Sequence, residues 1–171
     1  MMVLLLSLSA FAADPEAERI AESIYSAARD RQWKAVERRY VQLIDDHPSG
    51  LDGKIHMMGA EAARADGRLL QVAQRLQRVL PSEEGGPTAQ EALERLESAT
   101  GLVYIGMTEK AELVPDKVPF APDLKAAIET ASAELKSNGS FVGLLPAGSY
   151  TLGDLRIDVR PGFGVQSVGD P

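Results

Sequence analysis

Residues 33–44 of this chain read WKAVERRYVQLI, and residues 69–80 read LLQVAQRLQRVL. When the two segments are aligned at an offset of 36 residues, their apolar side chains coincide: Trp33 with Leu69, Val36 with Val72, Tyr40 with Leu76, Leu43 with Val79, and Ile44 with Leu80. Spacings of three and four residues between apolar side chains indicate amphipathic helices. A helical pattern that returns at this interval predicts stacked helical hairpins over residues 16–80.

Each repeated segment follows another helical segment in which the repeat is weaker. The aligned pairs there are Ser23 with Gly59, Ala27 with Ala63, and Asp30 with Asp66. Start and stop signals set the bounds: an Asp-Pro-Glu start at residue 14, a Pro-Ser-Gly stop at residue 48, an Asp-Gly turn at residue 66, and a proline at residue 81. We therefore expect helices at about residues 14–29, 32–47, 52–65 and 68–80.

The segment that follows predicts a fifth helix. Residues 81–87 form a turn-rich linker. Thr88 and Glu91 then have the spacing of a capping box, in which each side chain accepts a hydrogen bond from the other residue's backbone N–H. Leu93 and Leu96 give this helix an apolar side, and we expect it from residue 88 to about residue 98. A final amphipathic helix usually covers the exposed face of the last hairpin in a repeat array, and we expect that position here.

From residue 101 onward proline, glycine and β-branched residues become more common. Short apolar runs at residues 102–105 and 141–145 predict strands. A helix is expected between them, from Pro122 to about residue 137, because Asn138-Gly139 provides a stop signal. The last glycines fall in a segment that we interpret as a terminal tail; they are Gly162, Gly164 and Gly169.

Residues 149–159 predict a β-hairpin around Gly153-Asp154. A two-residue turn that opens with glycine fits the twist of the flanking strands. The expected register separates apolar pairs on one face from polar pairs on the other: Leu152 with Leu155, Tyr150 with Ile157, Thr151 with Arg156, and Ser149 with Asp158. We therefore expect Leu155 and Ile157 to face the core of the small domain.

Several residues of the first hairpin stand at a spacing that known helical repeats share. Trp33, Tyr40 and Pro48 lie in the second helix or at its end, and the small residues Ser23 and Ala27 lie in the helix before it. The region resembles the tetratricopeptide repeat family, although its period of 36 and its valines at alanine positions depart from the family pattern. The resemblance implies that first helices line a partner-binding face, whose residues here are Glu18, Tyr25, Lys54, Met57, Glu61 and Arg64.

Residues 144–152, LLPAGSYTL, resemble the Leu-Pro-x-Gly-x-Tyr strand entry of PEGA-type β-domains. That resemblance implies an envelope-associated β-sandwich module of a kind often joined to repeats. The expected helix at residues 123–137 interrupts the run of strands that such a module would have. A cleft lined by Tyr150, Phe141 and polar side chains would favour binding of a ligand or glycan.

Composition and motifs disfavour several functions. A net charge of −7 disfavours binding to nucleic acid and to anionic membrane surfaces, which require clustered basic residues. The absence of cysteine excludes disulfides, thiolate metal sites and a cysteine nucleophile. His47 and His56 lack metal-ligand spacing, and no serine-nucleophile or phosphate-binding glycine motif is present. We therefore expect no enzyme activity, no cofactor and no metal.

Residues 1–12 predict a secretory signal peptide. Residues 3–6 are strongly apolar, and Ala10-Phe11-Ala12 forms a small-x-small cleavage motif, so the mature chain is expected to begin at Ala13. No Lys or Arg precedes the apolar run, which leaves a buried N-terminal helix as the alternative. The run is too short to span a bilayer, and we expect no transmembrane segment in the mature chain.

Together these features predict an α+β protein. TPR-like antiparallel helical hairpins at residues 14–100 are expected to precede a small antiparallel β-rich domain with one helix at residues 101–168. The functional hypothesis is a non-enzymatic protein of the periplasm or exterior that binds a protein partner and acts as a scaffold. The alternative is a ligand- or glycan-binding β-module carried on a helical scaffold. An enzyme of unknown type is a third possibility, disfavoured by the missing nucleophile, metal and cofactor signals.

Overall fold

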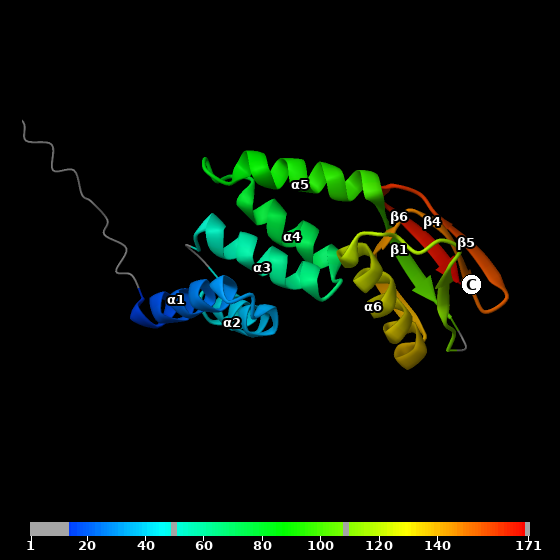
Figure 1. The fold of residues 1–171 in the computed structure, drawn as a ribbon, viewed down its shortest axis with the longest axis horizontal. Coiled ribbons are helices and arrows are strands. Elements are labelled where there is room, and N and C mark those ends of the chain that lie inside the picture. The colour runs from blue at the N-terminus through cyan, green and yellow to red at the C-terminus, as the bar shows by residue number, and fades with distance from the viewer. Residues whose placement is uncertain (1–13, 49–50, 108–109, 170–171) are drawn as a thin grey trace, which may run out of the picture.

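The computed structural model describes residues 14–48, 51–107 and 110–169. Helices come first, and strands with α6 among them follow, which confirms the α+β class (Figure 1). The helices are α1 (Pro15–Arg29), α2 (Trp33–Asp46), α3 (Gly53–Ala65), α4 (Leu69–Val79), α5 (Gly86–Ala99) and α6 (Pro122–Asn138). The strands are β1 (Thr100–Gly106), β2 (Leu113–Pro115), β3 (Ser140–Pro146), β4 (Gly148–Leu152), β5 (Leu155–Val159) and β6 (Gly162–Gly169). The expected signal peptide at residues 1–12 lies outside the described residues.

The first four helices form two hairpins, and the first helix of each begins in the same way. Asp14 precedes α1, and its Oδ1 accepts a hydrogen bond from the N–H of Glu16 at 2.9 Å. Asp52 precedes α3, and its Oδ1 accepts one from the N–H of Lys54 at 3.1 Å. Both aspartates therefore satisfy a backbone donor that the helix itself leaves unpaired.

The turn inside each hairpin also repeats. Arg31 has a φ of +54° in the first turn, and Gly67, 36 residues later, has a φ of +69° in the second. The next N–H closes both turns at 2.9 Å, from Gln32 to the Ala27 carbonyl and from Arg68 to the Ala63 carbonyl. The repeat in the sequence is thus a repeat of backbone geometry.

Three apolar clusters form the core. The first lies between α1, α2 and α3 and contains Ile24 and Leu43. The second joins α3, α4 and α5 to Ala127 of α6 and Leu144 of β3. The third joins α6 to both sheets. Because the second cluster contains side chains from both sides of residue 100, the hairpins and the β-rich part pack directly against each other. As expected, α5 packs against α4, the last helix of the repeat.

The strands form two three-stranded sheets. In one sheet β1 lies between β3, which is antiparallel to it, and β6, which is parallel to it. In the other sheet β4 lies between β2 and β5, and both pairs are antiparallel. The interpretation of residues 162–169 as a tail was therefore wrong. Their sequence, GFGVQSVG, has no regular apolar alternation, so pairing with β1 and not local propensity makes this segment a strand.

The predicted hairpin register is confirmed in all four cross-strand pairs, and Gly153 at the turn has a φ of +59°. Tyr150 and Ile157 are buried as expected. Leu155 is 41% exposed, however, so the expectation that it faces the core was wrong. It lies beside the turn in β5, an edge strand of its sheet, and is not part of the third apolar cluster, which contains Ile157.

Two further expectations need correction. Helix α5 begins at Gly86 and not at residue 88, because Pro87 fits the first turn of a helix. Thr88 therefore lies inside the helix and not at its N-terminal cap, so the capping box does not form. The N-terminal cap is Gly85, without a side-chain hydrogen bond. Trp33, which the repeat spacing places on the apolar face of its helix with Val36 and Tyr40, is only half-buried and packs at the edge of the first cluster.

Candidate functional site

The six candidate residues lie on the first helices of the two hairpins, and the repeat relates them. Glu18 of α1 aligns with Lys54 of α3, and Tyr25 of α1 aligns with Glu61 of α3 at the same offset of 36. Glu18 and Lys54 are exposed, whereas Tyr25, Met57, Glu61 and Arg64 are half-buried. Met57 packs against the second apolar cluster. Four polar candidates make contacts that fall into two groups along α3; they are Tyr25, Lys54, Glu61 and Arg64.

The first group surrounds the N-terminus of α3. The Tyr25 hydroxyl donates to Asp52 Oδ2 at 3.4 Å, so the residue that caps α3 also ties it to α1. Burial, and after it the charge of Asp52, raises the pKa of Tyr25 above its usual value. Lys54 Nζ lies 3.5 Å from Glu84 Oε2, with both side chains exposed. This group mainly fixes how α1 meets α3.

The second group lies near the C-terminus of α3, roughly 15 Å further along the helix at 1.5 Å per residue. Arg64 Nη1 is 3.5 Å from Glu61 Oε1, and Arg64 Nε is 4.0 Å from Asp123 Oδ2 at the start of α6. These side chains line a hollow of about 210 Å³ together with Trp33, Ala65 and Pro122. The structure thus places a half-buried tryptophan and an arginine in the lining of one hollow, where α2, α3 and α6 meet.

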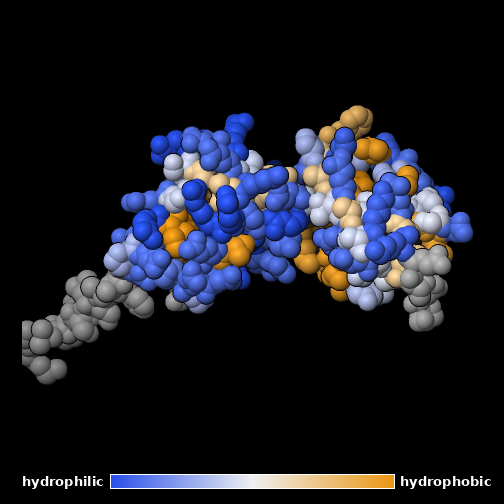
Figure 2. Space-filling model, turned by 90° about the horizontal axis from the view of Figure 1, so that it is seen from below, coloured by the Kyte–Doolittle hydropathy of each residue, from blue (hydrophilic) through white to orange (hydrophobic). Residues whose placement is uncertain are grey.

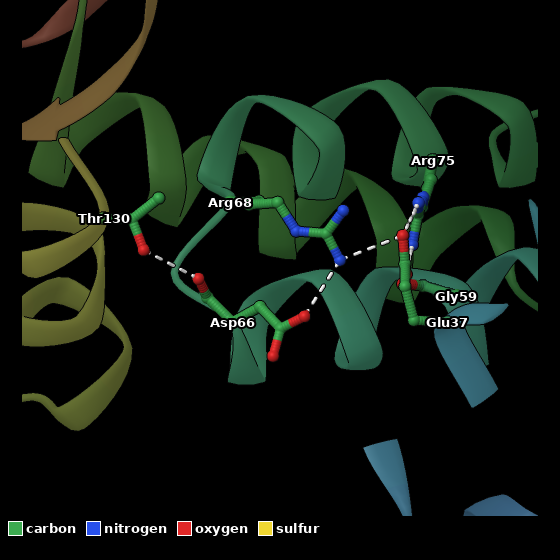
Figure 3. A network of polar contacts seen from close by, with 6 residues as sticks. All are labelled: Glu37, Gly59, Asp66, Arg68, Arg75 and Thr130. Atoms are coloured by element: carbon green, nitrogen blue, oxygen red, sulfur yellow. Dashed lines mark hydrogen bonds and ion pairs between the residues drawn. The ribbon is translucent and has the colours of Figure 1, made fainter. Parts of the chain in front are cut away.

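A buried polar junction joins the two hairpins, and the sequence did not predict it (Figure 3). Arg75 of α4 holds both carboxylate oxygens of Glu37 of α2, from Nη1 at 2.5 Å and from Nη2 at 2.8 Å. Arg75 Nη1 also donates to the Gly59 carbonyl at 2.6 Å. Arg68 Nη2 bridges Glu37 Oε1 at 2.9 Å and Asp66 Oδ2 at 3.0 Å. The side chains of Glu37 and Arg75 are only 13% and 8% exposed, so this ion pair lies inside the helical stack.

An aromatic contact completes the junction. The Tyr40 ring lies under the Arg75 guanidinium, 4.3 Å from centroid to Cζ, and its hydroxyl is 3.0 Å from His56 Nδ1. A Cβ at Gly59 would lie 2.6 Å from the Tyr40 ring, so only glycine lets the ring approach α3 this closely. Helix α2 therefore meets the second hairpin through a carboxylate and an aromatic ring three residues apart.

Burial acts differently on the two titratable groups of this junction. Burial alone would raise the pKa of Glu37, but the hydrogen bonds and charges of Arg75 and Arg68 outweigh it and hold that pKa below its usual value. Burial lowers the pKa of His56, and the nearby charges of Arg78 and Arg75 act in the same direction. Asp52 opposes this effect on His56. We therefore expect a charged Glu37 and a neutral His56 near pH 7.

The protein should lose stability as the pH falls below 6.5, the ordinary pKa of His56. Because the folded-state pKa is lowered, the unfolded chain binds a proton that the folded chain does not, so the free energy of unfolding decreases. The His56→Gln variant, which keeps a polar side chain beside Tyr40, should lose less stability over the same range. Urea unfolding of both chains above and below pH 6.5 tests this, and parallel pH dependence would contradict it.

A second hollow, of about 400 Å³, lies in the β-rich part between the loop at residues 116–120 and the β3–β4 turn. Its lining includes Tyr150, whose hydroxyl donates to the Pro146 carbonyl at 2.6 Å, and the polar residues Asp116 and Ser149. Phe141 is buried in the third cluster and does not line it. Phe120, which is 99% exposed, does. Sequence reasoning therefore named the wrong phenylalanine for this cleft.

In the part of the chain that the structure describes, no three His, Asp or Glu side chains gather as metal ligands would. His47 Nδ1 instead lies 3.0 Å from Asp14 Oδ2, which joins the end of α2 to the start of α1. Every helix within residues 14–48, 51–107 and 110–169 is too short or too polar to cross a membrane.

No known protein family matches the chain, and no curated protein or solved structure is significantly similar to it. The likeness to tetratricopeptide repeats and to PEGA-type domains accordingly rests on the residues quoted above.

Proposed function

We propose that this chain is a non-enzymatic, secreted or periplasmic protein that binds another protein through its helical hairpins. The observation that supports this most is the hollow that Trp33 and Arg64 line together with the carboxylates of Glu61 and Asp123. Tryptophan and arginine are the residue types most enriched at the energetic centres of protein interfaces. Charges of both signs around them would select among partners.

The rest of the hairpin surface supports a contact of this mixed kind. Of the large apolar side chains that are exposed in the described residues, only Val41 and Leu80 belong to the hairpins. On the face drawn in Figure 2, hydrophilic residues accordingly cover most of the hairpin part, and more of the apolar surface lies on the part that holds α6 and the strands. A partner of the hairpins would therefore use the aromatic and charged groups of the hollow and not a broad apolar strip.

The test uses the only tryptophan of the chain as the reporter. Mature protein would capture partners from envelope extract, and a purified partner would then be titrated while Trp33 fluorescence is recorded. Binding at the hollow should shift the emission to shorter wavelength, because the ring loses contact with water. The Arg64→Glu variant should bind about tenfold more weakly, since it reverses a charge at the centre of the contact.

The matched control is Arg95→Glu on α5, an exposed arginine whose side chain pairs with Glu91 on its own helix. It makes the same charge reversal away from the hollow and should bind like the unaltered chain. An unshifted Trp33 emission, or equal weakening by both variants, would contradict binding at the hollow. Mass spectrometry of protein from its host tests the proposed compartment, and an intact chain starting at Met1 in the cytoplasm would contradict it.

One observation favours the second candidate function, binding of a glycan by the β-rich part. Phe120 projects fully into solvent at the rim of the 400 Å³ hollow, where it could stack on the apolar face of a sugar. Asp116 and Ser149 would supply polar contacts beside it. Screening the chain and its Phe120→Ala variant against a glycan array distinguishes the two functions, because only this candidate needs Phe120.

A further inference from the structure

Helices α1 and α2 lie at the end of the helical stack away from the strands (Figure 1). The receiving side of the hairpin junction has a counterpart at this free end. At the junction, the second hairpin receives Glu37 and Tyr40 of the preceding α2. Arg68, just before α4, holds one oxygen of Glu37, and four further receiving residues lie on α3 and α4 themselves: His56, Gly59, Arg75 and Arg78. The first hairpin carries equivalent positions on α1 and α2, 36 residues earlier in the chain, which are Ile20, Ser23, Arg39 and Gln42.

The counterpart repeats the key hydrogen bond of the junction. Arg39 Nη1 donates to the Ser23 carbonyl at 3.1 Å, just as Arg75 Nη1 donates to the Gly59 carbonyl at 2.6 Å. Each bond anchors the guanidinium of a second helix on the first helix of its own hairpin. At the junction the anchored guanidinium then holds a carboxylate of the neighbouring helix. Arg39 makes no such ion pair within the described residues.

The space that α2 fills at the junction is a hollow at the free end. It measures about 270 Å³, and its lining is Arg19, Ile20, Ser23, Arg39 and Gln42. Four of these five residues are the counterparts of the receiving residues, so the hollow lies where the repeat would place another second helix. The first hairpin therefore presents a formed acceptor surface that no helix of the described chain occupies.

The surface at the free end differs from the receiving surface of the junction at two positions, and these differences indicate which side chains of a partner helix would fit it. Gly59 allows an aromatic ring to lie directly on α3, whereas Ser23 places a side chain in that space. His56, which contacts the Tyr40 hydroxyl, is replaced by apolar Ile20. An aliphatic side chain therefore suits the free end where a tyrosine suits the junction. The two arginines of the lining, Arg19 and Arg39, favour an acidic helix.

We propose that this end surface binds an amphipathic helix of another protein. A carboxylate of that helix pairs with Arg39, and an aliphatic side chain three residues later packs on Ile20 and Ser23. Residues three apart share one face of a helix, as Glu37 and Tyr40 do at the junction. A second copy of this chain does not meet the requirement, because none of its described helices has an exposed carboxylate three residues before Leu, Ile, Val or Met. This surface is separate from the hollow beside Trp33.

The probe is a labelled peptide of residues 33–46 with the substitution Tyr40→Leu, held helical by a staple opposite Glu37, because so short a helix is marginal alone. Its binding to the full chain is measured by fluorescence anisotropy. The Arg39→Ala chain should bind it about tenfold more weakly, as loss of one charge-assisted hydrogen bond predicts. A peptide that also carries Glu37→Gln should bind the unaltered chain more weakly than the first peptide does. The Arg39→Ala chain should bind the two peptides almost equally, because it lacks the partner of Glu37.

Exposed Gln42 provides variants that leave the fold of the hairpin intact. Gln42→Glu should weaken binding of the peptide, and Gln42→Arg, which copies Arg78 of the second hairpin, should strengthen it. The Ser23→Gly chain should gain affinity for the peptide with the native tyrosine, because glycine makes room for the ring. The Arg64→Glu chain, which tests the hollow beside Trp33, should bind this peptide like the unaltered chain. The two proposals can therefore fail independently.

Several outcomes would overturn the proposal. One is the absence of saturable binding, and another is equal binding by the unaltered, Arg39→Ala and Gln42→Glu chains. Equal binding would also result if the peptide displaced the chain's own α2, because that exchange uses Arg75 and not Arg39. Self-association that depends on Arg39, detected by analytical ultracentrifugation, would replace the partner helix with a second copy and so refute the proposal.

Discussion

Replacing Gly67 by alanine should lower the free energy of unfolding by about 3–5 kcal/mol, or prevent folding. The residue has a φ of +69°, a conformation that costs an L-residue with a side chain about 1–2 kcal/mol. In addition, a Cβ there would lie 2.3 Å from the carbonyl carbon of Ala126 in α6. Because that neighbour is helix backbone and not a flexible side chain, α6 would have to move away from the turn between α3 and α4.

The repeat supplies the matched control for Gly67. Arg31 occupies the equivalent position with a φ of +54° and is exposed, so the first turn tolerates a side chain where no helix packs on it. The Arg31→Gly variant should therefore change stability by less than about 1 kcal/mol. Urea unfolding followed by circular dichroism measures both variants. A Gly67→Ala chain as stable as the Arg31→Gly chain would show that α6 does not pack on the turn.

The sequence predicted those parts of the fold that local signals determine, and it missed those that depend on contacts between distant residues. Helices of the hairpins were predictable because their apolar spacing, their aspartate caps and their turns are all local signals, and the β4–β5 register was predictable for the same reason. Strand β6 was not, because it is made by pairing with β1 far away in the sequence. The start of α5 was misplaced because Thr88 and Glu91 carry a valid cap pattern, but Pro87 allows the helix to begin earlier.

The candidate sites were less predictable, since they depend on contacts between elements. Pattern alone placed Glu61 and Arg64 on α3, but not beside Asp123 of α6, which is distant in the sequence. The repeat spacing placed Trp33 on the apolar face of its helix, but Trp33 is the first residue of α2 and its side chain is only half-buried there. A signal for the junction did exist: Arg39 and Arg75 are aligned by the same offset as the apolar residues. Alignment of the apolar positions alone overlooked it.

The Arg75→Ala variant should lose about 3 kcal/mol of stability. It removes the bidentate partner of a carboxylate that is only 13% exposed, the hydrogen bond to the Gly59 carbonyl and the contact with the Tyr40 ring. Arg68 still holds one oxygen of Glu37, which places the loss at the lower end of the range for a broken buried pair. Arg39→Ala removes the equivalent carbonyl hydrogen bond without a buried carboxylate and should cost about 1 kcal/mol.

The pH dependence of the Arg75→Ala defect separates the ion pair from the lost packing. In the unaltered chain the pKa of Glu37 is below its ordinary value of 4.5, so its stabilising effect is complete above 4.5 and disappears as the pH falls through the folded-state pKa. The variant has less of this effect to lose. The difference in unfolding free energy between the two chains should therefore shrink below pH 4.5. A difference that stays constant would mean that the contact with Tyr40 and the hydrogen bond to the Gly59 carbonyl account for the whole defect.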